Sequence, residues 1–316
     1  MGGTSPRITI GLPVYNGERF LEKTLECLLG QTVANSELII SDNASTDHTE
    51  DICQTWASKD RRIRYYRNVE NLGAANNYRR VFELSHGTFF KWAAADDLCA
   101  PDYLARCVDI LDSDPSVVLA YAKTRFIDDG GNPLDIQDPG WALQSEQPHE
   151  RLRYVIFGGH WVNAIFGLIR SAALSKTRLV AHYRGGDYRL LGELSLLGKF
   201  FEVPDYLYFR RIHSNASSRH AHDQHWMEQF YSGNSSRISL PIWNRSIDHF
   251  TTILRSELTL PQKAGLVRDL LRSMRWQRPR LLGELKRGLN VYIHRSPVLR
   301  RITRNVILLT TSAFTT

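Results

Sequence analysis

The chain has 316 residues and a formal net charge of +7, and 42% of its residues are hydrophobic. This length and composition predict a globular protein with one large domain, or with one domain and an extension. No apolar stretch approaches the roughly 18 residues that a membrane span needs, which argues against a membrane-spanning chain.

Short apolar runs alternate with helical patterns in the first part of the chain. Strands are predicted at residues 7–13, 37–41, 62–67 and 117–123, and in the run that begins at Thr88. Helices are predicted at residues 18–29, 74–84 and 101–111, and after the loop 42–47. In that loop Thr46 or Asp47 is the expected helix cap, and Glu50 completes a capping box if Asp47 is the cap. The alternation predicts a mostly parallel sheet covered by helices.

The second part of the chain is less regular. Residues 128–150 are acidic and rich in turn residues, which predicts a long loop over the sheet. Further strands are predicted at residues 165–170, 200–203 and 207–211, a polar mobile loop at 213–219, and helices from residue 222 onward. Another helix is expected to begin at Gly185-Gly186-Asp187 and to turn Leu190, Leu191, Leu194 and Leu197 inward. We therefore expect an α/β domain over residues 1–220 and a helical, basic extension over residues 221–316.

Two adjacent carboxylates, Asp96 and Asp97, follow the apolar run that begins at Thr88, and Pro101 stands where a new helix would begin. In open α/β sheets, ligands bind beyond the carboxyl ends of the strands. Carboxylates at that position suit a divalent cation, because hard cations take carboxylate oxygens and can bridge substrate phosphates. The alternative for these residues is a helix N-cap, a position that aspartate favours.

Six motifs in this order resemble those of the family-2 glycosyltransferases of the GT-A fold, over roughly residues 7–215. They are Pro13-Val14-Tyr15-Asn16-Gly17-Glu18, Asp42-Asn43-Ala44-Ser45-Thr46-Asp47, Asn71-Leu72-Gly73, Ala95-Asp96-Asp97 with Pro101, Gly186-Asp187, and Arg210-Arg211-Ile212-His213. The resemblance implies a Rossmann-like, mostly parallel sheet with helices on both faces. It also implies an inverting enzyme that moves one sugar from a nucleotide-diphosphate sugar, of the UDP or dTDP type, to a hydroxyl of a glycan or lipid-linked acceptor. The chain lacks the Gln-x-x-Arg-Trp motif of the processive members, which favours transfer of a single sugar.

The resemblance implies a set of residues that bind the nucleotide sugar: Pro13, Tyr15, Asn16, Glu18, Asp42, Asn71, Asn77, Asp96, Arg210 and Arg211. A carboxylate such as Asp42 can accept hydrogen bonds from a uracil-type N–H or from ribose hydroxyls, and guanidinium groups match phosphate oxygens. The alternatives are an Asx-turn for Asp42, packing on the sheet edge for Tyr15, and turn or helix-surface positions for Asn71 and Asn77.

The implied cation is Mn²⁺ or Mg²⁺, with Asp96, Asp97 and His213 as its ligands. Ala94 stands where the family often has the first aspartate of its metal motif, which removes one expected contact. A lone histidine is more often structural than a ligand, and this alternative stays open for His213.

Asp187 occupies the position of the family's catalytic carboxylate, and the resemblance implies that it is the general base. Its alternative role is an N-cap, which can coexist with catalysis. The acceptor side is expected to include His160, Trp161 and Asn163, where Trp161 stacks on a sugar ring or is a core aromatic.

The basic charge is concentrated in residues 262–304, which hold twelve lysines and arginines against Asp269 and Glu284. Leucines recur among them at helical spacing. A basic amphipathic helix is typical of binding to a membrane surface, and the alternatives are a solvated extension or a self-association surface. Nucleic acid is not an expected partner, because no recognised reading module accompanies the charge.

Cys27, Cys53, Cys99 and Cys107 form no Cys-x-x-Cys pair, so we expect core thiols of a reducing compartment. No signal-peptide pattern opens the chain. We therefore expect a cytoplasmic protein that is peripheral on the inner face of the plasma membrane. Two rival functions are a sugar nucleotidyltransferase, which would need a basic Gly-rich loop after the first strand, and a binding protein for nucleotide sugars or membranes that has lost turnover.

Overall fold

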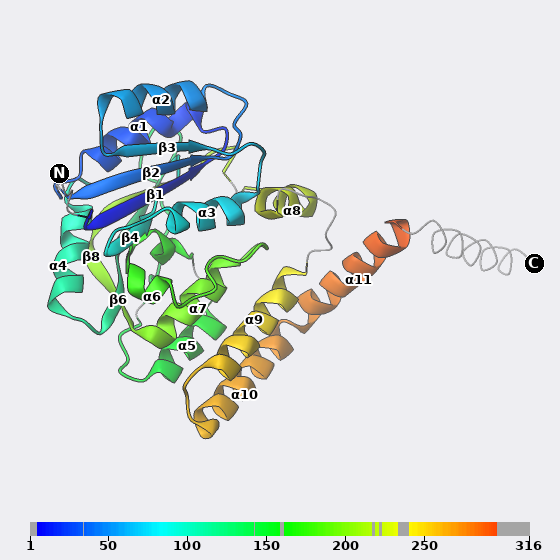
Figure 1. Ribbon diagram of the computed structural model, residues 1–316. Coiled ribbons are helices and arrows are strands. Elements are labelled where there is room, and N and C mark those ends of the chain that lie inside the picture. The colour runs from blue at the N-terminus through cyan, green and yellow to red at the C-terminus, as the bar shows by residue number, and fades with distance from the viewer. Residues whose placement is uncertain are drawn as a thin grey trace, which may run out of the picture.

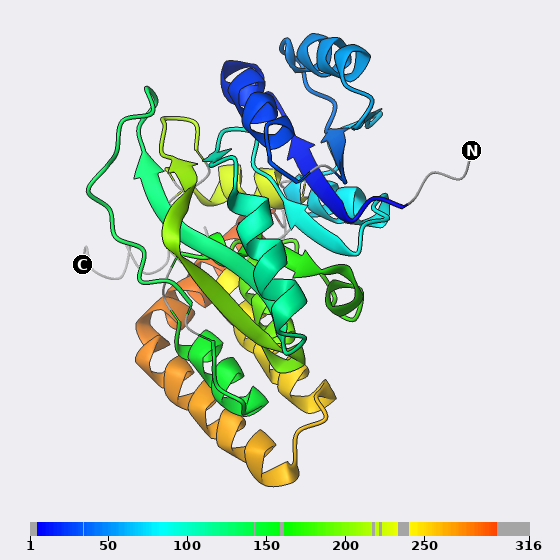
Figure 2. The same cartoon turned by 90° about the vertical axis from the view of Figure 1, so that its left-hand side faces the viewer.

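The structure is a computed structural model that describes residues 5–33, 35–141, 143–158, 161–216, 219–220, 223–232 and 240–295. Eight strands of the described chain form one sheet in the order β3-β2-β1-β4-β7-β6-β8-β5 (Figures 1 and 2). Their bounds are β1 Ile8–Val14, β2 Ser36–Asp42, β3 Ile63–Arg67, β4 Phe89–Trp92, β5 Leu98–Cys99, β6 Val117–Ile127, β7 Leu168–Arg170 and β8 Lys199–Arg211.

The sheet is parallel from β3 to β4 and mixed beyond it. β1 pairs in parallel with β2 and β4, and β6 pairs in parallel with β8. The short strand β7 is antiparallel to both of its neighbours, β4 and β6, and β5 is antiparallel to β8. The predicted fold class is confirmed, with a parallel half that brings the carboxyl ends of β1, β2 and β4 to one edge of the sheet.

Helices cover both faces of this sheet, so its central strands are buried on both sides. Leu38 and Ile40 of β2 belong to one buried cluster, and Ile39 between them belongs to the other, as the two-residue period of a strand requires. The first cluster is covered by α1 (Glu18–Leu29), α2 (Thr49–Lys59) and α4 (Tyr103–Ser113). The second is covered by α3 (Ala74–Glu83), α5 (Pro148–Phe157) and α7 (Asp187–Leu197).

Four helices follow β8 in the described chain, and two of them add to the second face. They are α8 (Gln224–Ser232), α9 (Pro241–Arg255), α10 (Leu260–Trp276) and α11 (Arg278–Arg295); the remaining short helices are η1 (Asn163–Phe166) and α6 (Ser171–Leu174). Ile253 of α9 and Leu266 of α10 lie in the same buried cluster as Leu190 of α7. The extension thus shares a core with the α/β body, and the predicted boundary at residue 220 stays a prediction. No helix of the described chain is long and apolar enough to cross a bilayer.

The predicted cap of α2 is wrong. The helix begins at Thr49, and the Asp47 carboxylate accepts the backbone N–H groups of both Thr49 and Glu18. Asp47 therefore joins the first turns of α1 and α2. Glu50 pairs with Arg67 rather than completing a capping box.

Three other local predictions differ from the structure. Residues 200–203 and 207–211 belong to the single strand β8, because the register shift between Ala122 and Lys123 of β6 accommodates Pro204 as a bulge. The predicted strand 165–170 begins instead as the 3₁₀ helix η1. Leu197, at the end of α7, is 42% exposed rather than inward.

His249 of α9 is buried against Gly192 of α7, and neither of its ring nitrogens has a hydrogen-bond partner in the described structure. Burial, together with the nearby guanidinium groups of Arg245 and Arg178, lowers the pKa of His249 to about 3. In the unfolded chain the ring titrates near its ordinary pKa of about 6.5. Between these values the unfolded chain binds more protons than the folded one, so stability falls as the pH falls through this window.

We expect His249→Leu to remove this pH dependence and to raise the free energy of unfolding. At pH 5 the titration term removed is about 2 kcal/mol. Urea unfolding at pH 7.5 and pH 5 measures the effect, with exposed His86→Gln as the matched control. A wild-type difference between the two pH values that persists unchanged in His249→Leu would contradict the assignment.

Candidate active site

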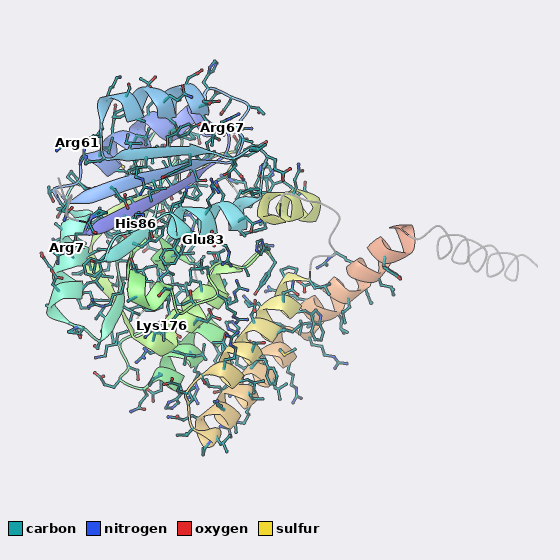
Figure 3. All side chains as sticks on the ribbon, in the orientation of Figure 1. Arg7, Arg61, Arg67, Glu83, His86 and Lys176 are labelled. Carbon is teal, nitrogen blue, oxygen red and sulfur yellow. The ribbon has the colours of Figure 1, made fainter. Side chains whose placement is uncertain are left out.

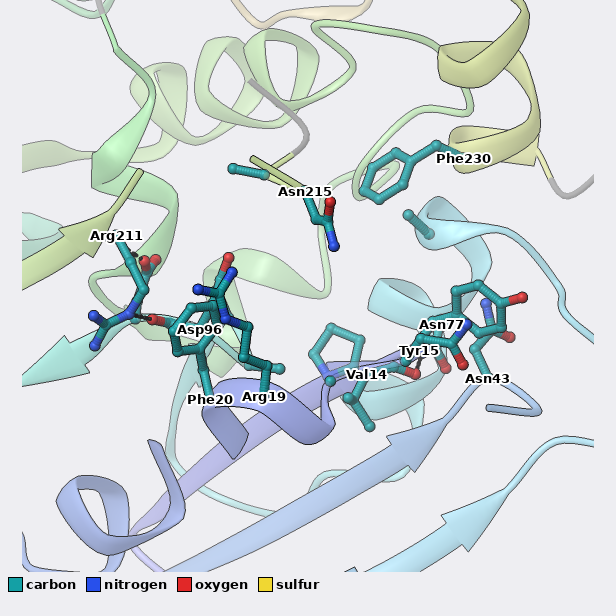
Figure 4. Close-up of a pocket in the computed structure, with 18 of the residues that line it drawn as sticks. Val14, Tyr15, Arg19, Phe20, Asn43, Asn77, Asp96, Arg211, Asn215 and Phe230 are labelled. Atoms are coloured by element: carbon teal, nitrogen blue, oxygen red, sulfur yellow. Dashed lines mark hydrogen bonds between the residues drawn. The ribbon is translucent and has the colours of Figure 1, made fainter. Parts of the chain in front are cut away.

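A cavity of about 490 Å³ lies beyond the carboxyl ends of β1 and β4 (Figure 4). This is the edge at which ligands of α/β sheets bind, and the volume lies in the range of ligand pockets. Residues of α1, α3, η1, the end of β8 and α8 complete its lining. The sequence therefore brings together segments that are far apart along the chain.

Most of the predicted site residues line this cavity. Those that do are Pro13, Tyr15, Asn16, Asn71, Asn77, Asp96, Asp97, Arg210, Arg211 and His213. Those that are described but do not line it are Glu18, Asp42, Trp161, Asn163 and Asp187. His160 lies outside the described residues.

A group of asparagine amides forms one side of the cavity. Asn43 donates from Nδ2 to Oδ1 of Asn71 at 2.7 Å. Asn77 is buried, accepts a hydrogen bond from Ser41 and donates to the Ser41 carbonyl. Tyr15, which is 49% exposed, lines the same cavity, and its contact with a nucleotide base stays a prediction.

Asp42 is fully buried behind that wall. Its Oδ1 accepts the N–H of Ser45 at 2.9 Å, and its Oδ2 accepts the Tyr65 hydroxyl and an Arg67 N–H. These bonds give Asp42 the turn-stabilising role that was its alternative, and its contact with a ligand stays a prediction. Glu18 likewise ties two loops together, because its carboxylate accepts the backbone N–H of His48.

Asp96 and His213 form a pair at the cavity wall. The His213 Nε2 and the Asp96 Oδ2 are 2.8 Å apart, and the buried His213 Nδ1 has no partner in the described structure. In the described chain no cluster of three or more potential metal ligands occurs. Mg²⁺-like cations keep several waters and bind through one or two carboxylates together with substrate phosphates, so this pair fits such an ion.

Asp97 is occupied by internal hydrogen bonds. Its Oδ2 accepts the Tyr208 hydroxyl and its Oδ1 accepts the backbone N–H of Arg211 at 2.8 Å. Burial, reinforced by the neighbouring Asp96 charge, raises the pKa of Asp97 to about 7. These contacts fasten the end of β8 to the loop after β4 and argue against Asp97 as a metal ligand, which stays a prediction.

The two arginines that end β8 have different surroundings. Arg211 is buried, and its guanidinium donates to the backbone carbonyls of Asp96, Asp128 and Asp129. Arg210 instead lies on the cavity wall, where its guanidinium stacks 4.9 Å from the centre of the Trp161 ring. Of the two, Arg210 is the better placed to bind an anion.

Arg210 also connects the cavity to the expected acceptor side. Its Nη1 donates to Oδ1 of Asn163, a buried residue that donates in turn to Asp138. Burial raises the pKa of both Asp97 and Asp187, and the Arg210 charge opposes this rise in both, so Arg210 lies within electrostatic reach of both carboxylates.

Asp187 is the first residue of α7, and its Oδ1 accepts the N–H of Tyr188 at 3.0 Å. Burial raises the pKa of Asp187, and this effect exceeds the opposing one of the Arg210 and Arg245 charges. A carboxylate with a raised pKa is a better proton acceptor when it is ionised, as a general base requires.

Lys91 of β4 lies buried beneath the cavity lining, and no local pattern of the apolar strand predicted its role. The ammonium is buried and donates to the carbonyls of Trp92 and Phe166, and it lies 5.0 Å from the ring centre of Tyr103. The Tyr103 hydroxyl donates to the same Phe166 carbonyl. These contacts fix Phe166, which lines the cavity.

The helix α8 brings aromatic side chains to the cavity that the sequence prediction left outside the site. Trp226 and Phe230 line it, and their rings stack with centroids 4.9 Å apart. Figure 4 shows Phe230 and Asn215 opposite Tyr15 and Asn77. The signal in the sequence was a pair of aromatic residues spaced by four in a predicted helix.

Comparisons with known proteins identify the family of the chain. The sequence profile described as Glycosyl transferase family 2 matches residues 9–174. A chondroitin synthase of Escherichia coli is 26% identical over 215 residues, which are 67% of this chain and 30% of that protein. The putative glycosyltransferase EpsH of Bacillus subtilis (strain 168) is 27% identical over 213 residues, which are 66% of this chain and 58% of that protein. The chain thus spans less than two thirds of these relatives' length.

Solved structures share the fold. TarS 1-349 of S. aureus in complex with UDP-GlcNAc has a TM-score of 0.67 at 15% identity, over 89% of this chain and 80% of that chain. The mannosyltransferase PcManGT from Pyrobaculum calidifontis, in complex with GDP-Man and Mn²⁺, has a TM-score of 0.55 at 17% identity, over 98% of this chain and 81% of that chain.

Proposed function

Because the chain belongs to glycosyl transferase family 2, we propose that it transfers a single sugar from a nucleotide-diphosphate sugar to a hydroxyl group of an acceptor. The observation that carries this proposal is the Asp96–His213 pair, which lines the same cavity as Tyr15 and Arg210. The aromatic ring of Tyr15 suits the base of such a donor. The cation site and the guanidinium group of Arg210 suit its negatively charged diphosphate.

The donor is bound with its base against Tyr15 and the asparagine wall, and with its diphosphate toward Asp96 and Arg210. A UDP or dTDP donor is favoured, and the complexes of the fold relatives with UDP-GlcNAc and GDP-Man support a nucleotide-sugar donor in general. Asp96 and His213 would hold a Mn²⁺ or Mg²⁺ ion, which when bound neutralises charge on the diphosphate. The guanidinium of Arg210 adds hydrogen bonds to the diphosphate oxygens.

Asp187 is the general base in this proposal. Its carboxylate takes the proton of the acceptor hydroxyl, and the acceptor oxygen forms a bond to the anomeric carbon from the face opposite the diphosphate. The bond from that carbon to the diphosphate oxygen breaks with its electron pair on the oxygen, so the configuration inverts. Trp161 and Asn163 are held beside the site by Arg210 and are proposed to border the acceptor.

The acceptor is a glycan or a lipid-linked saccharide of the kind used in making cell-envelope polysaccharides. The relative named as a putative teichuronic acid biosynthesis glycosyltransferase, TuaG of Bacillus subtilis, supports this class. The competing function is a protein that binds nucleotide sugars without turnover, because Ala94 replaces an acid of the family's motif. Metal-dependent hydrolysis of the donor separates the two.

Nucleotide binding and its dependence on the cation test the proposal directly. UDP or dTDP with Mn²⁺ is expected to raise the melting temperature by at least about 3 °C at about 100 times its Kd. EDTA should remove most of this shift, because the diphosphate then loses the ion that joins it to Asp96. UMP, which lacks the second phosphate, is the control for the diphosphate. ADP, which carries a purine, is the control for the base. If no nucleoside diphosphate shifts the transition with either cation, the proposal fails.

A further inference from the structure

The last described helix, α11, carries an exposed apolar stripe. Leu282, Leu285, Leu289 and Tyr292 are 46%, 42%, 59% and 56% exposed. Their spacings of three, four and three residues place them on one side of the helix. An exposed stripe of four large apolar side chains marks an interaction surface rather than scattered surface residues.

The side of α11 next to this stripe is already used inside the molecule. Leu281 and Glu284 are buried, and the Glu284 carboxylate accepts the backbone N–H groups of Ile242 and Trp243 at the start of α9. The Trp243 indole donates to the Leu281 carbonyl. These contacts fix the rotation of α11, so its apolar stripe is held outward.

On α10 and α11 the acidic side chains are buried, whereas most of the basic side chains are exposed. Their two carboxylates, Asp269 and Glu284, are buried, and Asp269 pairs with Arg153 at 2.7 Å. The exposed charged side chains described on these helices are all basic: Arg268, Arg272, Arg275, Arg278, Arg280, Lys286 and Arg287. On α11, Arg278 and Lys286 lie on or beside the apolar stripe, whereas Arg280 and Arg287 lie on the opposite side of the helix. Every exposed charge described on the two helices is positive.

An exposed tryptophan lies at the junction of the two helices. Trp276 is 64% exposed, and the Arg272 guanidinium lies 5.0 Å from the centre of its ring. Figure 1 shows α11 extending from the body past the start of α9, and Figure 3 shows side chains of α10 and α11 projecting from this pair. Tryptophan and arginine together are typical of side chains at the boundary between lipid and water.

We propose that the outer side of α10 and α11 docks on an anionic lipid bilayer, with Leu282, Leu285, Leu289 and Tyr292 inserted between headgroups and the basic residues on the lipid phosphates. A second copy of the chain fits less well, because paired helices of this kind use acidic partners for their basic flanks, and Glu284 is buried. A nucleic acid would leave the apolar stripe in water. This inference does not depend on sugar transfer and is tested without a donor.

Sedimentation of the full chain with unilamellar vesicles tests the proposal. Binding is expected to vesicles of phosphatidylcholine with phosphatidylglycerol, and to be at least tenfold weaker to pure phosphatidylcholine. The triple variant Arg272→Glu, Arg278→Glu, Lys286→Glu should lower binding by at least about 100-fold, because each surface cation contributes roughly fivefold. The matched control reverses three exposed cations elsewhere, Lys23→Glu, Arg61→Glu and Lys176→Glu, and should bind at least tenfold more tightly than that variant.

The apolar stripe is tested separately from the charge. Leu282→Ser, Leu285→Ser and Leu289→Ser together should lower vesicle binding at least tenfold while the chain keeps a cooperative thermal transition, because these side chains are 42–59% exposed. An environment-sensitive fluorophore on Leu285→Cys should shift to the blue with anionic vesicles, and the same probe on exposed Val69→Cys should not.

Three results would overturn the proposal. They are equal binding to neutral and anionic vesicles, an unshifted probe at position 285, and a dimer that the triple serine variant converts to monomers.

Discussion

Replacing Asp187 by asparagine is expected to lower turnover by about 10²–10⁴-fold, the usual contribution of a general base, while the affinity for the donor changes little. Asparagine keeps the oxygen that accepts the Tyr188 N–H, so the first turn of α7 should persist. What it loses is the ability to take a proton from the acceptor hydroxyl. Because burial raises the pKa of Asp187, the base should lose its charge at a higher pH than an ordinary aspartate does.

The wild-type rate is therefore expected to fall as the pH is lowered through this raised pKa, since the base must be ionised to act. Steady-state kinetics with a saturating donor measure both effects, and the acid limb should disappear in Asp187→Asn. Asp205→Asn, a carboxylate whose side chain is 51% exposed and pairs with Arg106, is the control. Turnover within threefold of wild type in Asp187→Asn would remove Asp187 from the role of base.

The sequence predicted the parts of the site that lie in loops directly after strands. Tyr15, Asn71 and Asp96 follow β1, β3 and β4, and parallel pairing alone carries β1 and β4 to one edge. Turn-forming and polar residues after apolar runs have few roles other than caps and ligand contacts. Their place in the site could therefore be predicted from the sequence.

Other parts of the site depend on tertiary contacts that no local pattern encodes. Whether Asp42 faces the cavity or Tyr65 and Arg67 depends on how β3 packs beside β2. Lys91 reads as an interruption of an apolar strand, and only the fold places Tyr103 and Phe166 around its ammonium. The rings of α8 reach the cavity across a connection whose path the sequence does not specify.

The same reasoning explains why the direction of the strands was only partly foreseen. Consecutive strand–helix units favour parallel pairing, and β1 to β4 obey this rule. β7 is three residues long and enters between β4 and β6 from the 3₁₀ helix η1, in the opposite direction. A segment of three residues is too short for its hydrophobic pattern to indicate whether it pairs in parallel or antiparallel.

Replacing Asp96 by asparagine is expected to weaken Mn²⁺-dependent binding of the donor by at least about 100-fold, more than the loss of a group that merely supports a ligand. The Asp96 carboxylate is the only charged oxygen ligand of the proposed pair, and a neutral amide compensates little of the charge of a divalent ion. Calorimetric titration with donor and Mn²⁺, and with donor and EDTA, measures the loss.

Asp97→Asn is the matched control, because it exchanges one carboxylate oxygen for an amide nitrogen in the adjacent residue. Its Oδ1 would still accept the Arg211 N–H, so binding of metal and donor should stay within about threefold of wild type. The exchange should instead disturb the bond from the Tyr208 hydroxyl and lower the free energy of unfolding by about 1–3 kcal/mol. If Asp97→Asn weakens Mn²⁺-dependent binding as much as Asp96→Asn does, both carboxylates hold the cation, and the hydrogen bonds of Asp97 must rearrange when the ion and donor bind.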